Sequence, residues 1–237
     1  MCLEKEQIYR FASTIKKMKI SYIFLLGRPG CGKSVVYKIF EEKLKKFGIE
    51  CQRVDDFLTL KEILSEDKEF KRHILKNGGF EVTDWSVVDE ALQRLNILIK
   101  ERRSENKIIF IEFARNNYTN AFKNFTKDVL DESLILYLYS TFEECYKRNI
   151  ERFKKAKKEG HDDHIVPLDL MKTYYRTDDY EQAYLKSEEE LMKIVPTKTI
   201  VLDSTVPGEE GIKNLTKQIE EKFINEFLYD RHLPNFP

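Results

Sequence analysis

A glycine-rich octapeptide separates a run of apolar residues from an amphipathic stretch near the start of the chain. Its sequence, Gly27-Arg28-Pro29-Gly30-Cys31-Gly32-Lys33-Ser34, fits the pattern G-x-x-x-x-G-K-[ST] in full. Glycines allow the backbone N–H groups of such a turn to point inward, and a helix that begins there adds the positive end of its dipole. The octapeptide therefore predicts a loop that binds the phosphates of a nucleotide, between a buried strand and a helix.

The residue types of this loop indicate how it would hold ATP and Mg²⁺. Lys33 would bridge the β- and γ-phosphates, and Ser34 offers a hydroxyl to Mg²⁺. The residues expected to contact the nucleotide are Gly27, Pro29, Gly30, Cys31, Gly32, Lys33, Ser34 and Val35. Kinases, GTPases, helicases and transporters share the pattern. Because the chain has no [NT]-K-x-D guanine-reading motif and no L-S-G-G-Q transporter signature, we expect a kinase.

Composition and charge narrow the class of protein. Hydrophobic residues make up 41% and charged residues 35% of the 237 residues, which is typical of one globular domain over 1–237. The 41 basic residues balance the 41 acidic ones, so no net field attracts nucleic acid. A small-molecule partner is therefore favoured, and nucleic acid stays possible only through a local basic cleft. Apolar runs such as Ile20–Leu26 are too short for a membrane span, which needs about 20 residues.

The four cysteines are typical of a reducing compartment. Cys2, Cys31, Cys51 and Cys145 are too far apart for a C-x-x-C metal site, and the N-terminus does not resemble a secretory signal. We therefore expect reduced thiols and a cytoplasmic location. Cys31 lies beside a helix N-terminus, which would lower the pKa of its thiol. Oxidative inhibition of nucleotide binding is one hypothesis for Cys31, and a small spacer residue is the alternative.

Short β-branched and aromatic runs alternate with charged amphipathic stretches, as in parallel sheets whose strands are joined by crossover helices. The expected strands are Ile20–Leu26, Ile49–Val54, Lys107–Glu112, Ser133–Tyr139 and Lys198–Asp203. A helix should follow Gly32 and end near Gly48, a residue suited to a left-handed C-terminal cap. The pattern predicts an α/β fold in three layers, with helices on both faces of a five-stranded parallel sheet.

The segment between the second and third strands is far longer than one crossover needs. Helical patterns over Leu58–Lys76 and Asp84–Arg103 predict an inserted helical flap over about 57–104. Asn77-Gly78-Gly79 should form the turn between the two helices.

A second unusual segment follows the fourth strand. Lysines gather after Glu151 and precede a turn-prone stretch that contains His161 and His164. This charge density predicts a mobile basic lid over about 153–167. A metal site on the two histidines is less favoured than a solvated turn, because one short loop rarely supplies the supporting hydrogen bonds of such a site.

Acidic residues follow two of the expected strands, at the edge of the sheet where the phosphate loop should lie. Glu112 ends the third strand, where a carboxylate could orient water on Mg²⁺. Asp55 and Asp56 follow the second strand, and the carboxyl ends of adjacent parallel strands face one crevice. Asp55 is the preferred base for an acceptor hydroxyl, and Asp56 could bind the acceptor, with helix capping as the alternative. Arg115 could hold an acceptor phosphate or be an ordinary surface arginine.

Two arginines lie four residues apart on the helix expected after the fourth strand. Arg148 and Arg152 would project from one face beside the lid. Planar guanidinium groups suit the charge of a migrating phosphoryl group, so both are candidate catalytic residues, although an ion-paired surface is the alternative. Trp85 on the flap could stack on an acceptor base, but a place in the hydrophobic core is the simpler expectation.

Three patches together resemble P-loop kinases of the adenylate kinase-like group, and within it the polynucleotide 5′-kinases and zeta-toxin-like kinases. The loop carries the Pro-Gly that is common in that group, and Val54-Asp55-Asp56-Phe57 is similar to its R-D-D-Y/F segment. The third patch comprises Lys147–Arg152, Ile165–Asp169 and Met171–Arg176, which are similar to the lid arginines of that group and the V-P-x-D helix behind them.

This resemblance implies a set of roles and a topology. Asp55 would be the general base, and Lys33, Arg148 and Arg152 would clamp the transition state. The sheet order would be 2-3-1-4-5, counted over the five expected strands. Leu58 stands where polynucleotide kinases usually have an arginine. Glu112-Phe113-Ala114-Arg115 is closer to the D-G-F-P-R of nucleoside monophosphate kinases, although it is one residue shorter.

Three functions are consistent with these features. We expect phosphoryl transfer from ATP·Mg²⁺ to a hydroxyl or phosphate of a small molecule such as a nucleoside, a nucleotide or a related metabolite. An ATP-binding switch with little turnover and a polynucleotide 5′-hydroxyl kinase are the alternatives. An anion site near Asp55, Arg115 and Arg148 would favour the small-molecule kinase, whereas a continuous basic channel would favour the nucleic-acid kinase.

Overall fold

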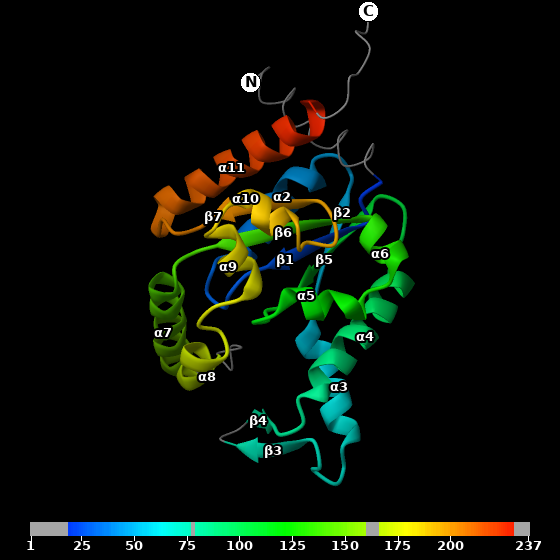
Figure 1. The fold of residues 1–237 in the computed structure, drawn as a ribbon, viewed down its shortest axis with the longest axis vertical. Helices are drawn as coiled ribbons and strands as arrows, with labels where there is room; N and C mark the ends of the chain where they lie inside the picture. The colour runs from blue at the N-terminus through cyan, green and yellow to red at the C-terminus, as the bar shows by residue number, and fades with distance from the viewer. Residues whose placement is uncertain (1–18, 77–78, 160–165, 230–237) are drawn as a thin grey trace, which may run out of the picture.

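The computed structural model describes residues 19–76, 79–159 and 166–229. Its centre is a five-stranded parallel sheet (Figure 1). The strands of this sheet are β1 (Tyr22–Leu26), β2 (Glu50–Asp55), β5 (Lys107–Glu112), β6 (Ser133–Tyr139) and β7 (Thr199–Asp203). All five expected strands are present, and the largest shift of an edge is that β1 begins at Tyr22 rather than at Ile20.

The order of the strands across the sheet is β2-β5-β1-β6-β7. Tyr22 pairs with Ile109 of β5 on one side and with Ser133 of β6 on the other, so β1 lies at the centre. The strand numbers differ from the expected order 2-3-1-4-5 because that order counted five strands only. Two strands that the sequence did not predict, β3 (His73–Lys76) and β4 (Gly79–Val82), precede β5 in the chain and raise the numbers of the later strands. These two strands form a separate antiparallel hairpin.

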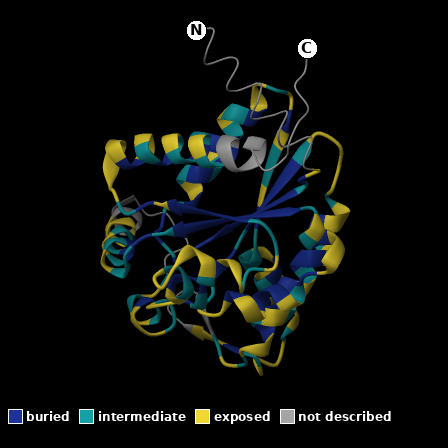
Figure 2. Ribbon diagram, turned by 45° about the horizontal axis from the view of Figure 1, so that its top comes forward, coloured by how far each residue is buried: buried dark blue, intermediate teal, exposed yellow. Residues whose placement is uncertain are grey.

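Helices cover both faces of the large sheet. On one face lie α2 (Lys33–Lys45) and α11 (Gly208–Tyr229), and Phe40 of α2 packs against Phe110 of β5 and Phe223 of α11. The helices on the other face are α4 (Ser86–Glu101), α5 (Tyr118–Ala121), α9 (Asp179–Tyr184) and α10 (Glu188–Met192). Figure 2 shows buried strands between helices whose outer faces are exposed. The α/β class with helices on both faces is therefore confirmed.

Further helices complete the described part of the chain. They are α3 (Asp56–Glu66), the 3₁₀ helix η1 (Phe122–Asn124), α6 (Lys127–Asp131), α7 (Phe142–Glu159) and α8 (Leu168–Thr173). Within the described ranges, no helix combines the length and the apolar character needed to cross a membrane.

The flap differs from the pair of helices that the sequence predicts. The expected helix over Leu58–Lys76 is wrong beyond Glu66, where α3 ends. The carboxylate of Asp67 accepts hydrogen bonds from the backbone N–H groups of Lys71 and Arg72, at 3.1 and 2.8 Å. Such local bonds compete with helix continuation. The chain then forms the β3–β4 hairpin, which projects away from the sheet below α3 and α4 (Figure 1).

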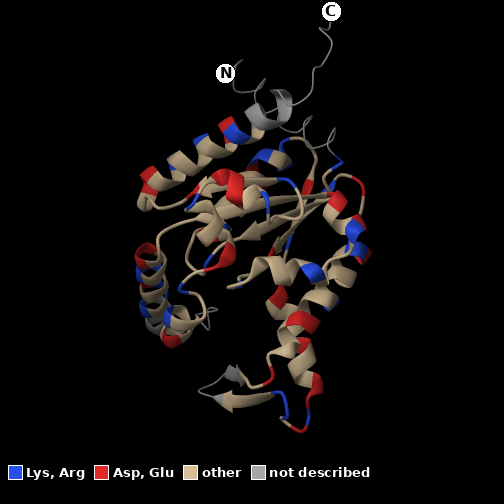
Figure 3. Ribbon diagram, viewed as in Figure 1, with Lys and Arg blue, Asp and Glu red and all other residues tan. Residues whose placement is uncertain are grey.

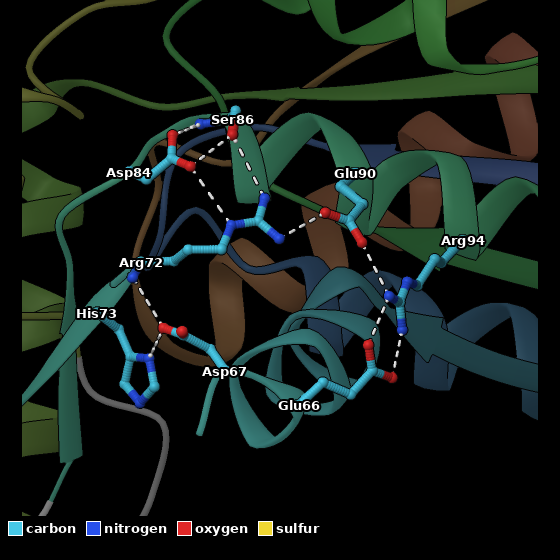
Figure 4. Close-up of polar contacts among 8 residues, drawn as sticks. All are labelled: Glu66, Asp67, Arg72, His73, Asp84, Ser86, Glu90 and Arg94. Carbon is cyan, nitrogen blue, oxygen red and sulfur yellow. Dashed lines mark hydrogen bonds and ion pairs between the residues drawn. The ribbon is translucent and has the colours of Figure 1, made fainter. Parts of the chain in front are cut away.

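Ion pairs fix the hairpin and the two flap helices to one another (Figure 4). Arg72, just before β3, donates to Glu90 of α4 at 2.7 Å and to Asp84 at 3.3 Å. Arg94 of α4 donates to both carboxylate oxygens of Glu66 in α3, at 2.7 and 2.8 Å. Bidentate pairs of this kind add geometric specificity. Both arginines of this network are therefore neutralised by carboxylates.

Candidate functional site

The site forms at the carboxyl edge of the sheet. The phosphate loop Gly27–Ser34 follows β1, Asp55 ends β2 and Glu112 ends β5. Asp55 and Glu112 are register partners in adjacent strands. The ammonium nitrogen of Lys33 lies 3.9 Å from Oε1 of Glu112. The structure thus brings the loop and both predicted carboxylates together.

Three glycines give the loop its shape. Gly27, Gly30 and Gly32 have φ values of 128°, 86° and 97°, a region that other residues adopt only with strain. A Cβ on Gly27 would lie 2.5 Å from the carbonyl oxygen of Leu138, and one on Gly30 would lie 2.6 Å from that of Cys145. The loop therefore packs directly against the backbone of β6 and α7, with no room for side chains at these two positions.

The start of α2 offers donors to an anion. Gly32 is the N-cap of α2 and supplies no side-chain cap. In the described part of the chain, the backbone N–H groups of Gly32 and Ser34 have no acceptor, while that of Lys33 donates to the Cys31 sulfur. Unpaired amides at the positive end of a helix dipole form an anion site. The loop thus fits the phosphates of ATP.

Ser34 and Glu112 are suitable as the protein ligands of a Mg²⁺ site. The Ser34 side chain is exposed at the start of α2, and Glu112 lies on the adjoining strand end. No group of three or more His, Cys, Asp or Glu among the described residues could hold a metal. Mg²⁺ at phosphate sites usually takes one or two protein ligands besides phosphate and water, which is what these two residues could supply.

The Lys33 side chain is buried and folds back over the loop. Its ammonium group donates to the carbonyl oxygens of Gly27 at 2.7 Å and Arg28 at 3.0 Å. The carboxylate of Glu112 also pairs with Arg53 of β2. Lys33, Glu112 and Arg53 therefore form a continuous chain of charges from the loop to β2.

The remaining predicted nucleotide contacts differ in burial, namely Cys31, Val35 and Pro29. The Cys31 side chain is fully buried in the core, and Val35 packs against the same core. Burial raises the pKa of the Cys31 thiol although Lys33 lies close by. The expected lowering of this pKa is therefore wrong, because desolvation outweighs the nearby positive charge. Pro29 is partly exposed.

Arg28 is a loop residue whose importance the sequence did not reveal. Its guanidinium is buried and donates to the carbonyl oxygens of Tyr175, Arg176 and Ser140, at 2.7, 2.8 and 3.0 Å. It also pairs with Glu181 at 2.5 Å. Burial alone would lower the pKa of Arg28, but the hydrogen bond and charge of Glu181 raise it. Arg28 occupies a variable position of the loop pattern, so no signal marked it.

A buried carboxyl lies behind the loop. Asp178 accepts hydrogen bonds from the Tyr137 hydroxyl at 3.0 Å and from the backbone N–H of Glu181 at 2.8 Å. Burial raises the pKa of Asp178 to about 7. Nearby, the Tyr118 hydroxyl accepts a hydrogen bond from the backbone N–H of Gly27 at 2.9 Å. The first residue of the loop is thus held from the α5 side of the sheet.

Asp55 and Asp56 point in different directions. Asp55 is the N-cap of α3, and its Oδ1 accepts a hydrogen bond from the backbone N–H of Leu58 at 3.3 Å. The capping alternative for Asp55 is therefore confirmed, and its place beside Glu112 keeps it next to the loop. Asp56 instead forms an ion pair with Arg115, with 2.6 Å between Oδ2 and Nη2.

Arg115 is not a surface arginine. Only 10% of its side chain is exposed. Its Nη1 donates to the carbonyl oxygen of Ala114 at 2.8 Å, and its guanidinium lies 5.7 Å from the centre of the Phe113 ring. Burial lowers the pKa of Arg115, but the charge and hydrogen bond of Asp56, together with Tyr175 and Tyr174, raise it above its usual value. Arg115 is therefore charged and neutralised by Asp56.

Trp85 is not in the core as expected. It is 50% exposed, because α4 begins at the next residue and leaves Trp85 at the end of the flap nearest the 174–176 segment. Its ring stacks on Tyr174, with centroids 5.0 Å apart and an angle of 22°. Burial raises the pKa of Tyr174, and the charge of Arg115 opposes this rise. Nη2 of Arg115 donates to the carbonyl oxygen of Val88 at 3.5 Å, and the backbone N–H of Val88 donates to the carbonyl oxygen of Trp85 at 3.1 Å.

The two predicted arginines of α7 have different surroundings. Arg148 Nη1 donates to the carbonyl oxygen of Gly30 at 3.4 Å, and Nη2 donates to that of Ser204 at 2.9 Å. Its Nε pairs with Glu144 at 2.9 Å. Arg152 is exposed and has no hydrogen bond or ion pair within the described ranges. The structure thus brings Arg148, but not Arg152, to the loop. Residues 160–165 of the expected lid, with His161 and His164, lie outside the described residues.

Comparison with known proteins finds similarity in solved structures alone. No family model matches the chain, and no curated protein matches it. The chain is similar to APE1195 at 17% identity, over 86% of this chain and 97% of that one, with a TM-score of 0.50. It is also similar to APS kinase CysC of Mycobacterium tuberculosis in complex with AMPPNP and APS, at 14% identity, over 85% and 98% of the chains, with a TM-score of 0.49. A third similar structure is shikimate kinase of Acinetobacter baumannii in complex with shikimate. The identity is 15%, the similarity covers 90% of this chain and 99% of that one, and the TM-score is 0.48. At these identities the likeness is one of fold.

Proposed function

We propose that this chain is a kinase that transfers the γ-phosphoryl group of ATP, with Mg²⁺, to a hydroxyl or phosphate of a small molecule. The observation that carries the proposal is the meeting of a phosphate loop with carboxylates of two adjacent strands. Lys33 lies 3.9 Å from Glu112, and Asp55 is the register partner of Glu112. A phosphate loop alone also suits a switch, but a carboxylate on the acceptor side is what phosphoryl transfer to a hydroxyl needs.

The donor half of the site is formed by the loop and the start of α2. The N–H groups of Gly32 and Ser34 would donate to phosphate oxygens, and Lys33 would exchange its carbonyl partners for the β- and γ-phosphates. Ser34 and Glu112 would hold Mg²⁺, which neutralises charge on the phosphate oxygens when bound. This arrangement supplies positioning and charge stabilisation, the two requirements of phosphoryl transfer.

The acceptor half lies between β2 and the flap. Asp55 would accept the proton of the attacking hydroxyl, while Asp56 and Arg115 would hold the rest of the acceptor. Arg148 would stabilise the transferring group, since its guanidinium already lies at hydrogen-bond range of Gly30 in the loop. Arg152, one turn further along α7, would join it only after a movement of α7.

The arrangement of segments supports a place in the adenylate kinase-like group. The chain would act as one domain over 1–237, with the flap at about 57–104 on the acceptor side and the lid at about 153–167 near the donor. Acidic residues stand beside basic ones along α7 and the flap (Figure 3). This mixture favours a small molecule over a nucleic acid as the acceptor.

The test is phosphoryl transfer from labelled ATP to a set of small acceptors, with two lysine variants of the same helix. Lys33→Ala should lower kcat/KM for ATP at least about 100-fold, because the positive charge at the γ-phosphate is lost. Lys43→Ala is the control, since Lys43 of α2 pairs with Glu220 of α11. Equal activity of the two variants, or no transfer to any acceptor by the wild-type protein, would contradict the proposal.

A further inference from the structure

The ion pair between Asp56 and Arg115 belongs to the proposed acceptor half of the site and is largely removed from water. The two side chains are 17% and 10% exposed, and the bond between Oδ2 and Nη2 is 2.6 Å long. Only part of the hydrogen-bonding capacity of Arg115 is used. Among the described residues, its buried Nε has no hydrogen-bond partner. Unpaired buried donors are rare and costly, so this one points to a ligand that accepts from it.

The charge of this pair decides what kind of ligand can bind. An arginine that grips a phosphate does so as a free, doubly donating cation. Here the positive charge of Arg115 is already cancelled, and a phosphate placed on it would meet the carboxylate of Asp56 at close range. A neutral pair of one acceptor group and one donor group instead matches hydroxyls, which both donate and accept.

Three arginines of β2 and the flap offer no spare charge. Arg53 at the end of β2 pairs with Glu112. On the flap, Arg72 and Arg94 are each bonded to carboxylates of the network in Figure 4. Among these described arginines, each therefore has a carboxylate partner. A terminal phosphate of an acceptor would find no unpaired guanidinium among these three. Arg176 has no carboxylate partner among the described residues, but its guanidinium lies 5.0 Å from the centre of the Phe142 ring of α7, on the donor side.

Two stacked aromatic rings lie near the Asp56–Arg115 pair. Trp85 is half-exposed and is fixed by its stacking on Tyr174. Arg115 reaches the same end of α4, since its Nη2 donates to the carbonyl oxygen of Val88 at 3.5 Å. A flat apolar face next to a carboxylate and a guanidinium suits a ring that has C–H groups on its face and hydroxyls at its edge.

We infer that the acceptor presents neighbouring hydroxyl groups of an uncharged polyol ring, and not a phosphate, to Asp56 and Arg115. This inference rests on the proposed kinase function and names its substrate class. One hydroxyl donates to Asp56, and another accepts from Arg115. A third hydroxyl near Asp55 attacks the γ-phosphorus: a new O–P bond forms, the bond between the γ-phosphorus and the β,γ-bridging oxygen breaks, ADP leaves, and the hydroxyl proton passes to the Asp55 carboxylate.

The first test uses inorganic phosphate as the probe and needs no knowledge of the acceptor. Trp85 is the single tryptophan of the chain, so its fluorescence reports on the surroundings of its exposed ring. With the loop filled by a non-hydrolysable ATP analogue and Mg²⁺, Asp56→Asn should bind phosphate at least about tenfold more tightly than the wild-type protein. Adding Arg115→Met to this variant should abolish the gain.

Two controls keep this test decisive. Glu66→Gln also removes a carboxylate from an arginine, in the flap network, and should leave the phosphate response of Trp85 unchanged. The double variant Asp56→Asn with Arg115→Met has no unpaired buried charge, so it should melt close to the wild-type temperature even if Asp56→Asn alone is destabilised. Equally tight phosphate binding by the wild-type protein and Asp56→Asn would overturn the inference.

The second test compares acceptors in pairs that differ by one phosphate, namely glucose with glucose 6-phosphate, ribose with ribose 5-phosphate and adenosine with AMP. ADP formation should show a kcat/KM for the best uncharged member at least about tenfold above that of its phosphorylated partner. Asp56→Asn should raise KM for the uncharged member and reduce this preference. Preference for the phosphorylated members overturns the inference but leaves the kinase function standing. No turnover with any member contradicts the kinase function, and the phosphate probe then decides the inference alone.

Discussion

Replacing Gly30 by alanine should force the phosphate loop away from α7. Gly30 has a φ of 86°, and a Cβ there would lie 2.6 Å from the carbonyl oxygen of Cys145. The left-handed backbone costs an alanine about 1–2 kcal/mol. Separating the new methyl group from a backbone carbonyl adds about 1–3 kcal/mol, because neither atom lies at the end of a flexible side chain. The free energy of unfolding should therefore fall by about 2–5 kcal/mol.

The variant Gly48→Ala separates the cost of the left-handed backbone from the cost of the close contact. Gly48 also has a positive φ, 68°, but nothing lies within 4 Å of a Cβ built there. This variant should lose only the backbone contribution of about 1–2 kcal/mol. Urea unfolding gives both values, and titration calorimetry gives the affinity for ATP, which should fall in Gly30→Ala alone. Equal losses of stability in the two variants would refute the reasoning from close contact.

Three further predictions concern the residues around the loop. Because burial raises the pKa of Asp178 to about 7 from 3.8, the folded protein holds a proton that the unfolded chain releases between these values. The free energy of unfolding should therefore fall as the pH rises through this window, by up to about 1.4 kcal/mol per pH unit. Asp178→Asn should flatten this dependence on pH, as measured by urea unfolding. The same dependence on pH in both proteins would count against the raised pKa. Arg28→Met should lower the free energy of unfolding by about 3–5 kcal/mol, because Glu181 is left buried without its partner, and a loss under about 1 kcal/mol would show that this pair is not needed. Burial of the Cys31 thiol and its raised pKa predict slow reaction with a thiol reagent in the native protein, so rapid labelling of Cys31 would contradict its position in the core.

The donor half of the site could be predicted because its constraints are local. The backbone turn from Gly27 to Ser34 depends on glycines at fixed spacing, and a buried strand and a helix flank it in the chain. Four of the five strands of the large sheet are mostly apolar and buried, which gives them a clear signal. The edge strand β2 has a single buried residue, Val54. Lys33, Asp55 and Glu112 then follow from the geometry of parallel strands, whose carboxyl ends meet at one edge.

The acceptor half could not be predicted because it depends on contacts between distant segments. The neutral charge of the Asp56–Arg115 pair depends on an ion pair between two residues that lie 59 positions apart in the chain. The exposure of Trp85 depends on where the flap places the start of α4. The β3–β4 hairpin was missed since its strands are short and since the turn made by Asp67 uses side-chain bonds that no periodicity reveals.

The measurement that tests phosphoryl transfer most directly is the rate of transfer from labelled ATP by Asp55→Asn. Asparagine is as good an N-cap as aspartate, so the bond that Asp55 accepts from the Leu58 N–H at 3.3 Å is retained and the fold should be unaffected. With a hydroxyl acceptor, kcat should fall about 100- to 10,000-fold, because the proton of the hydroxyl loses its acceptor, while the Kd for ATP and the melting temperature stay the same. A kcat equal to that of the wild-type protein would contradict the role of Asp55 as the base, and no transfer by the wild-type protein would contradict the kinase itself.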